Sequence, residues 1–223
     1  MIKGIIFDFD GLILDTETHH FRILQDMFAE YGSELPIERW QQEIGTQTGF
    51  SPFHYLEELI EQEIEHKQLR QQVKEKFHAK LAEEKARDGV EDYLEAAKEL
   101  GLKVGLASSS DYEWVSKYLK NLGLFGYFEC IKTSDDVEKV KPDPALYVKA
   151  AHCLGLQPEE CVAFEDSANG ALAAKKAGMG CVIVPNEVTR TMDFCAVEHR
   201  LSSMADMPLG ELIEHLNTLR VSK

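Results

Sequence analysis

Two pairs of acidic residues each follow a short apolar run of the chain. Asp8 and Asp10 come after the first such run, and Glu165 and Asp166 come directly after a later one. Carboxylates this close together repel one another and resist burial, so we expect a bound cation or shifted pKa values. A donor set made only of oxygen atoms suits Mg²⁺, which proteins commonly share with substrate phosphates, whereas zinc prefers His or Cys ligands. The four carboxylates therefore predict a Mg²⁺ site.

A hydroxyl and an ammonium group occupy comparable positions elsewhere in the sequence. Ser108 follows another apolar run, and Lys141 stands just before a segment with helical spacing. With Mg²⁺ bound, Lys141 would neutralise part of the remaining negative charge and so allow a phosphate dianion to approach. Each position also has an ordinary interpretation, because hydroxyls and acids are common helix caps or first-turn residues and a lysine suits a surface. Their joint occurrence at the ends of separate elements favours phosphate chemistry.

These side chains meet only if the apolar runs are neighbouring strands of one sheet. The apolar runs expected to form strands are 2–7, 104–107, 128–131, 161–164 and 181–184. They alternate with segments of helical spacing at 18–31, 93–100, 114–122, 143–154, 168–177 and 209–216. Such alternation predicts an α/β fold with a doubly wound parallel sheet covered by helices on both faces. Parallel strands bring their carboxyl ends to one edge, where open α/β sheets bind ligands.

Residues 16–87 interrupt this pattern with a stretch that lacks strand-like runs. Their apolar residues recur at helical spacing, and from residue 53 onward the composition is rich in Glu, Gln, Lys and His. We therefore expect two domains. Residues 1–15 and 88–223 would form the core domain, and residues 16–87 would form a small inserted α-helical domain. Its charge-rich face is expected to be solvated surface.

The overall charge limits the partners of the protein. The 223 residues include 24 Lys and Arg against 39 Asp and Glu, which gives a formal charge of −15. Such a charge repels nucleic acid and anionic membranes, so any anionic ligand needs a local positive site. No apolar run approaches the ~20 residues that span a bilayer, and we expect no leader segment. We expect a monomer or weak homodimer that binds neither nucleic acid nor membrane.

The cysteines predict a reducing compartment. Their number is odd, no C-x-x-C pair occurs, and most lie in apolar segments, at Cys130, Cys153, Cys161, Cys181 and Cys195. This pattern is typical of reduced core residues and unlike a disulfide framework or a zinc site. We therefore expect a cytoplasmic protein.

Four segments together resemble the motifs of the haloacid dehalogenase (HAD) superfamily. They are residues 8–16 (DFDGLILDT), 106–110 (LASSS), 141–144 (KPDP) and 164–170 (FEDSANG), and they occur in the family's order. Val140 departs from the pattern, since many relatives have glycine before this lysine. The chain is most similar to the branch of phosphatases and β-phosphoglucomutases, whose helical cap is inserted early in the chain. The resemblance implies a Rossmann-like core and a phosphatase that acts on a small phosphorylated metabolite.

The resemblance also implies a role for each acidic residue. Asp8 would be the nucleophile that forms an aspartyl-phosphate, and Asp10 would protonate the leaving oxygen and then activate water. Mg²⁺ would be held by Asp8, the backbone carbonyl of Asp10 and Asp166. Glu165 would bind the ion directly or through water.

The same resemblance assigns the remaining polar residues of the motifs. Ser108 and Lys141 would hold phosphoryl oxygens and offset charge in the transition state, a contribution often worth ~3 kcal/mol per donor. Ser109 would assist in binding the substrate phosphate. Asp15 and Thr16 fall at the family's hinge, so closure of the cap would exclude water during transfer.

A β-phosphoglucomutase-like phosphotransferase is the main alternative to a phosphatase. His20 stands where such mutases also carry a histidine, although a histidine on an early cap helix is more often a surface or packing residue. The resemblance places a phosphate-clamping arginine of the mutases in the loop after Gly45, but here this loop carries Thr48 and no arginine. Arg39 or Arg70 would have to substitute. We therefore favour the phosphatase, with His20 and Thr48 as candidate substrate contacts.

Three further functions fit the sequence less well. A dehalogenase also uses a nucleophilic aspartate, but Asp10 supplies the proton donor that an ester leaving group requires. A receiver domain for phosphotransfer signalling clusters similar groups but is much shorter and has no early helical insert. A non-catalytic phosphate-binding protein would not need the full set of catalytic side chains, which is intact here.

Overall fold

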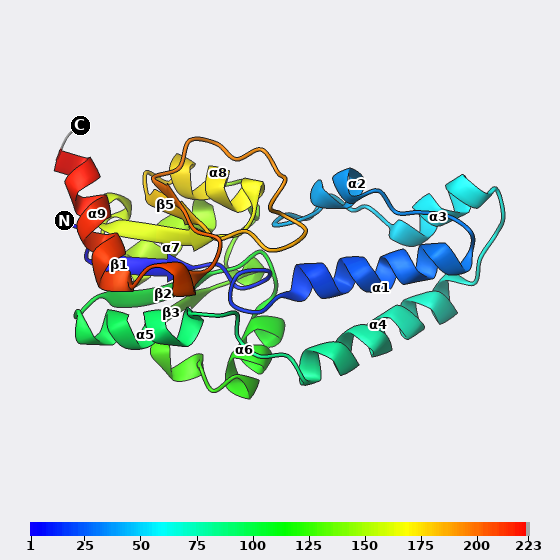
Figure 1. Cartoon of the computed structure of the whole chain (residues 1–223), viewed down its shortest axis with the longest axis horizontal. Helices are drawn as coiled ribbons and strands as arrows, with labels where there is room; N and C mark the ends of the chain where they lie inside the picture. Colours follow the sequence, from blue (N-terminus) through cyan, green and yellow to red (C-terminus); the bar gives the residue numbers. More distant parts are fainter. Residues whose placement is uncertain (222–223) are drawn as a thin grey trace.

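The computed structural model of the protein describes residues 1–221. Within these residues, one parallel sheet of six strands has the order β3-β2-β1-β4-β5-β6 (Figure 1). The strands are β1 (Gly4–Phe7), β2 (Lys103–Ala107), β3 (Cys130–Lys132), β4 (Cys161–Glu165), β5 (Gly180–Ile183) and β6 (His199–Arg200). The prediction of an α/β fold with a doubly wound parallel sheet is confirmed. β6 was not predicted, because two residues are too few to show an apolar pattern.

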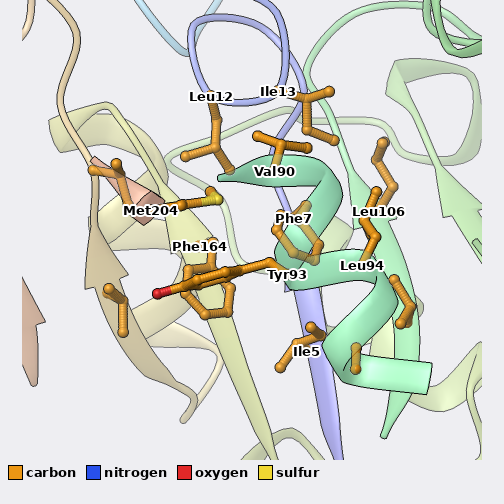
Figure 2. Close-up of a cluster of buried hydrophobic side chains, with 14 of the residues drawn as sticks. Ile5, Phe7, Leu12, Ile13, Val90, Tyr93, Leu94, Leu106, Phe164 and Met204 are labelled. Carbon is orange, nitrogen blue, oxygen red and sulfur yellow. The ribbon is translucent and has the colours of Figure 1, made fainter. Parts of the chain in front are cut away.

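Helices cover both faces of this sheet. They are α5 (Val90–Glu99), α6 (Tyr112–Asn121), α7 (Ala145–Cys153), α8 (Ala168–Lys176) and α9 (Leu209–Val221). Side chains alternate along a strand, so Ile5 and Phe7 of β1 pack with α5, α6 and α9, whereas Ile6 packs with α7 and α8. Figure 2 shows the first cluster, where Phe7 and Tyr93 both contact the ring of Phe164. This two-sided burial explains the unbroken apolar run of β1.

Four helices lie to one side of the sheet rather than on it (Figure 1). They are α1 (Thr16–Glu30), α2 (Ile37–Gln41), α3 (Pro52–Ile60) and α4 (His66–Ala82). Most of their apolar residues form a separate hydrophobic cluster, in which Leu24, Phe28 and Leu56 are fully buried, whereas Leu81 near the end of α4 packs with the cluster of the sheet. α1 begins two residues earlier than predicted because Asp15 caps it, accepting a hydrogen bond from the backbone N–H of Thr18.

Short connections complete the described chain. Single 3₁₀ turns occur at Phe125–Tyr127, Ser134–Asp136, Pro158–Glu160 and Met204–Asp206. Over residues 1–221, no helix combines the length and the apolar character needed to cross a membrane.

A disulfide joins Cys130 to Cys153, so the expectation that all five cysteines are reduced was wrong for this pair. Cys130 begins β3 and Cys153 ends α7, and the packing of this helix beside β3 brings their Cα atoms to 6.1 Å, within bonding reach. Their separation of 23 residues carries no sequence signal for pairing. The cysteine pattern therefore no longer argues for a reducing compartment.

Candidate active site

The register of two central strands places two acidic residues side by side. β1 pairs with β4 so that Phe7 lies beside Phe164, and Asp8 and Glu165 come next on each strand. The backbone N–H of Asp8 donates to the carbonyl of Phe164 at 3.0 Å, which extends the ladder by one bond. All of β1 is buried, and Asp8 itself is only 5% exposed. The sheet thus places both carboxylates in the interior of the protein.

Lys141 supplies a positive charge between these two carboxylates. Its Nζ lies 2.5 Å from Asp8 Oδ1 and 2.7 Å from Glu165 Oε1, and the residue is 1% exposed. The Nζ also lies 4.9 Å from the centre of the Tyr147 ring, whose hydroxyl donates to Glu165 Oε1 at 2.6 Å. Burial alone would lower the pKa of Lys141, but the charges of Asp8 and Glu165 raise it above its usual value. Lys141 is therefore a charged ammonium at neutral pH.

Protein donors occupy both oxygen atoms of Glu165. Its Oε1 accepts from Lys141 and the neighbouring tyrosine hydroxyl. Its Oε2 accepts from the backbone N–H groups of Asp166 at 3.2 Å and Ser167 at 3.3 Å, and from the Ser167 hydroxyl at 3.1 Å. The space is so tight that a Cβ at Gly170 would lie 1.8 Å from Oε1. Glu165 thus holds Lys141 in place and has little capacity left for a metal ion.

Asp166 has one carboxylate oxygen without a partner. Its Oδ2 accepts from Asn186 Nδ2 at 2.8 Å, but among the described residues its buried Oδ1 has no hydrogen-bond partner. Leaving a buried oxygen unpaired costs about 1–3 kcal/mol, which a bound cation would offset. Carboxylate oxygens of Asp8, Glu165 and Asp166 all lie within 4.8 Å of one another. This all-oxygen donor set, with an unpaired oxygen in it, fits a hard divalent cation such as Mg²⁺.

The charges of this acidic cluster also favour a cation. Burial raises the pKa of Asp8 to about 8, and the charge of Glu165 adds to the shift while Lys141 opposes it. Burial, followed by the charges of Asp8 and Glu165, raises the pKa of Asp166 well above its usual value. A divalent cation would stabilise the ionised forms, so the electrostatics and the donor set agree.

The side chain of Asp10 belongs to a second group of contacts. Its Oδ1 accepts from the Thr16 hydroxyl at 3.1 Å and from the indole N–H of Trp114 at 2.9 Å. Its Oδ2 accepts from the Ser110 hydroxyl at 2.6 Å, and Ser108 Oγ lies 3.4 Å away. The Asp10 side chain lies outside the acidic cluster, so only its backbone carbonyl remains a candidate metal ligand. The donors instead fix the Asp10 carboxylate near the start of α1.

A cavity of about 230 Å³ joins the two groups. Its wall includes residues from the sheet edge, from α1 and from the loop after α2, namely Asp8, Asp10, Ser108, Ser109, Glu17, His20, Gly45 and Gln47. The cavity therefore holds the acidic end of β1 and the first residues of the inserted helices on opposite walls.

Both predicted serines line this cavity and also have local partners. Ser108 is 1% exposed, and its Oγ accepts the backbone N–H of Ser110 at 3.0 Å. Ser109 Oγ donates to the carbonyl of Gly45 at 3.1 Å, and Gln47 Nε2 donates to the carbonyl of Ser109 at 3.1 Å. Ser109 thus connects the end of β2 to the loop after α2.

The structure brings His20, but not Thr48, to the cavity beside the acidic cluster. The ring centroid of His20 lies 5.0 Å from that of Trp40 and 4.8 Å from that of Phe77. Burial lowers the pKa of His20 to about 4, so its imidazole is neutral at pH 7. Thr48 is exposed, hydrogen-bonds to Glu43 and lines a neighbouring pocket of about 600 Å³.

The two expected hinge residues connect α1 to Asp10. Asp15 caps the helix through the backbone N–H of Thr18, and the Thr16 hydroxyl donates to the Asp10 carboxylate. Rotation of α1 would therefore act directly on Asp10.

Several residues of this site were not predicted from the sequence. Trp114 and Ser110 contact Asp10, and Asn186 contacts Asp166. Glu17 lines the cavity, where burial, followed by the charge of Asp10, raises its pKa to about 8. Asn186 follows the last predicted strand, so its position at a strand end was an available signal, whereas Trp114 could not be distinguished from an ordinary helix residue.

The sequence matches known proteins over almost its whole length. The family described as haloacid dehalogenase-like hydrolase matches residues 5–184. A putative phosphatase, YhcW of Bacillus subtilis, is 60% identical over 98% of this chain and 99% of its own length. Hexitol phosphatase B of Escherichia coli is 32% identical over 95% of this chain and 97% of its own length.

Solved structures show the same fold. CbbY from Rhodobacter sphaeroides in complex with phosphate superposes with a TM-score of 0.70 at 29% identity, over 92% of this chain and 96% of that one. A putative β-phosphoglucomutase from Thermotoga maritima gives a TM-score of 0.72 at 26% identity, over 98% and 99% of the two chains. Sequence, fold and cluster agree, and the chain therefore belongs to the haloacid dehalogenase-like hydrolases, among which it is a phosphatase, a hydrolase of phosphoric monoesters.

Proposed function

We propose that this phosphatase hydrolyses a small phosphorylated metabolite in a Mg²⁺-dependent reaction that passes through an aspartyl-phosphate on Asp8. The observation that carries the proposal is the buried contact of Asp8 with Lys141, 2.5 Å long, beside Asp166, whose Oδ1 has no partner in the described chain. A carboxylate nucleophile, a cation that offsets phosphoryl charge and an unpaired oxygen ligand are the groups that phosphoryl transfer needs.

The proposed reaction has two steps. Asp8 attacks phosphorus as the bond to the leaving oxygen breaks, and Asp10 gives its proton to that oxygen. Asp10 then takes a proton from water as the water oxygen attacks phosphorus, the bond to Asp8 breaks and phosphate leaves. Lys141 and Ser108 would hold phosphoryl oxygens, with Ser109 assisting. Mg²⁺ held by Asp8, the Asp10 carbonyl and Asp166 would offset the charge of the phosphoryl group. Glu165 would hold Lys141 in place.

Movement of the inserted helices is part of the proposal. We assign residues 1–15 and 88–223 to a core domain and residues 16–87 to a cap that turns at Asp15 and Thr16. The hydrophobic cluster of the four helices, whose buried members all come from residues 16–87 except Val188, supports this division. Hydrogen bonds join the two parts near the site, such as Asn169 Nδ2 to the carbonyl of Ile44 at 2.9 Å and Ser109 Oγ to the carbonyl of Gly45 at 3.1 Å, and movement of the cap would have to break them. Closure would bring the cap over the cavity and exclude water.

Removal of the metal tests the cofactor. Phosphate release should stop in EDTA and return when Mg²⁺ is added back in excess. Asp166→Asn should raise the Mg²⁺ concentration for half-maximal activity by on the order of 10–100-fold, because the unpaired oxygen belongs to this residue. Glu165→Gln is the matched comparison. It should raise the Mg²⁺ concentration for half-maximal activity less, since protein donors occupy both Glu165 oxygens. Full activity in EDTA would contradict the proposal.

The indole of Trp114 is expected to position Asp10 for proton transfer. Trp114→Phe removes the donor to Asp10 but keeps a ring to stack on Phe77, whose centroid is 5.9 Å away. We expect kcat/KM to fall about tenfold for an alkyl phosphate and to change little for p-nitrophenyl phosphate, because nitrophenolate leaves without a proton.

Trp40→Phe is the control for this measurement. Trp40 lies among the inserted helices, and its indole N–H has no partner among the described residues. Its replacement should leave the ratio of kcat/KM between the two substrates unchanged. An equal loss on both substrates for Trp114→Phe would show a structural role only.

A mutase was the alternative that the sequence left open, and a substrate panel separates the two reactions. Arg39 forms an ion pair with Glu43 and lies 3.6 Å over the ring of Phe50, and Arg70 lies 4.6 Å over Phe53 beside the neighbouring pocket. Neither arginine lines the cavity beside Asp8. We expect phosphate release from sugar, polyol or other metabolite phosphates. Conversion of β-glucose 1-phosphate to glucose 6-phosphate, with a trace of the bisphosphate, would instead establish the mutase.

The formal charge of −15 supports a protein that avoids nucleic acid and anionic membranes. We also propose a monomer or weak homodimer in the cytoplasm, which sedimentation and cell fractionation would test.

A further inference from the structure

Three potential metal ligands meet at the end of the inserted helices. His54 and Glu57 lie on α3, and His66 is the first residue of α4. His66 Nε2 lies 2.8 Å from Glu57 Oε1, and His54 Nδ1 lies 3.4 Å from Glu57 Oε2. The ligand atoms of all three residues lie within 4.8 Å of one another. None of the three lines the cavity that contains Asp8.

Local structure holds these ligands together before any ion binds. Ser51 caps α3 and fixes the start of the helix. His54 and Glu57, three residues apart, lie on one face of it. The backbone N–H of Ile64, in the loop between α3 and α4, donates to Glu57 Oε1 at 3.1 Å and orients the carboxylate. His66 and Glu57 have side chains only 23% and 25% exposed, whereas His54 is 66% exposed. Two ligands are thus held by the protein, and the third can close on an ion from solution.

We propose that His54, Glu57 and His66 form a second metal site, which takes a transition-metal cation of the Zn²⁺ class. Two imidazoles and one carboxylate are a common zinc ligand set, and a water molecule would complete a tetrahedral shell. Mg²⁺ disfavours imidazole ligands, so this site and the all-oxygen cluster at Asp166 would select different ions. The acidic loop that follows α3 adds negative charge nearby, through Glu61, Glu63 and Glu65.

An ion at this site would fasten α3 to α4. The two helices are already joined by a short loop and by a hydrogen bond from Arg70 to Ser51 Oγ at 3.1 Å, and closing the loop with a metal restricts the chain further. The ring centroids of Phe53, on α3, and His66 lie 6.1 Å apart. The guanidinium carbon of Arg70, on α4, lies 4.6 Å from the centroid of the Phe53 ring. Phe53 and Arg70 both line the 600 Å³ pocket that adjoins the active-site cavity. Metal binding would therefore stiffen one wall of the pocket next to the candidate active site.

The test is metal binding to the whole protein in excess Mg²⁺, which fills the acidic cluster. Titration calorimetry with Zn²⁺, and visible absorption with Co²⁺, should show one ion bound per chain in a tetrahedral field. His66→Ala should weaken Zn²⁺ binding by about tenfold or more. Glu57→Gln should weaken Zn²⁺ binding less, because glutamine can still accept the hydrogen bond from the backbone N–H of Ile64. His152→Ala, an exposed histidine on α7, is the matched control and should bind as the wild type does.

Stability gives a second readout that does not depend on activity. Zn²⁺ should raise the Tm of the wild type and of His152→Ala, and should leave the Tm of His66→Ala unchanged. His54 is exposed, so His54→Ala keeps the test decisive if His66→Ala does not fold. Equal Zn²⁺ affinity in the wild type and in both histidine variants would overturn the proposal. Loss of Zn²⁺ binding only in Asp166→Asn would also overturn it, since the ion would then occupy the acidic cluster.

Discussion

Replacing Asp8 by asparagine is expected to reduce phosphate release by ~10⁴-fold or more while the protein stays folded. Asparagine cannot act as the carboxylate nucleophile, although it fills the same space between Lys141 and the end of β1. The remaining carboxylate, Glu165, still pairs with Lys141 at 2.7 Å, so the buried cation keeps a partner. Loss of activity without loss of structure would therefore mark Asp8 as a reacting group.

The stability of this variant can be predicted from the pKa of Asp8. The folded pKa of about 8 exceeds the ordinary value of 3.8, so the free energy of unfolding falls as pH rises between these values. Asparagine removes this penalty, and the Tm in EDTA at pH 8 should be equal to or above that of the wild type. Asp92→Asn, an exposed change on α5, is the control and should leave phosphate release unchanged. Substantial Mg²⁺-dependent hydrolysis by a folded Asp8→Asn protein would refute the assignment.

Replacing Lys141 by methionine should damage both the reaction and the fold. The variant leaves Asp8 and Glu165 buried without their shared cation, and breaking such a buried pair costs about 3–5 kcal/mol. We expect the free energy of unfolding in urea to fall by this amount at pH 8 and by less at pH 5. The reason is that Lys141 opposes the rise in the pKa of Asp8, so without this cation the Asp8 carboxyl group becomes protonated more readily as the pH falls. Turnover should fall by on the order of 10³-fold through loss of phosphoryl stabilisation.

Two comparisons make this result specific to the buried pair. Lys98→Met changes an exposed lysine of α5 and should leave both stability and turnover near wild-type values. Adding Glu165→Gln to Lys141→Met should recover part of the lost stability, because it removes one of the uncompensated charges. If Glu165→Gln instead lowered the stability of Lys141→Met by as much as it lowers the stability of the wild type, the two residues would not be coupled.

The acidic cluster was predictable because it follows from strand alignment. Residues at the ends of parallel strands must meet at one edge, so Asp8, Glu165 and Asp166 come together in any fold that pairs β1 with β4. The sequence also predicted that Lys141 supplies a local positive charge. The structure places this charge in direct contact with Asp8. The alternation of apolar runs likewise predicted the strands in the right order along the chain.

Contacts that depend on side-chain direction were not predictable. The Asp10 carboxylate is two residues from Asp8, yet it joins Trp114 and Ser110 because of the path of the loop after β1. The Cys130–Cys153 disulfide depends on how α7 packs beside β3, which no spacing rule encodes. Thr48 lies in a loop without periodicity, and it lines the neighbouring pocket instead of the cavity.

The most direct test of the account is covalent phosphate on Asp8 during turnover. In an Asp10→Asn variant, p-nitrophenyl phosphate should still react, because its leaving group needs no proton, but hydrolysis of the intermediate should be slow without the base. We predict a burst of one nitrophenolate per chain and, by mass spectrometry of the acid-quenched protein, one phosphate on the peptide that contains Asp8. Nitrophenolate release with no covalent phosphate, or with phosphate on another residue, would contradict the account.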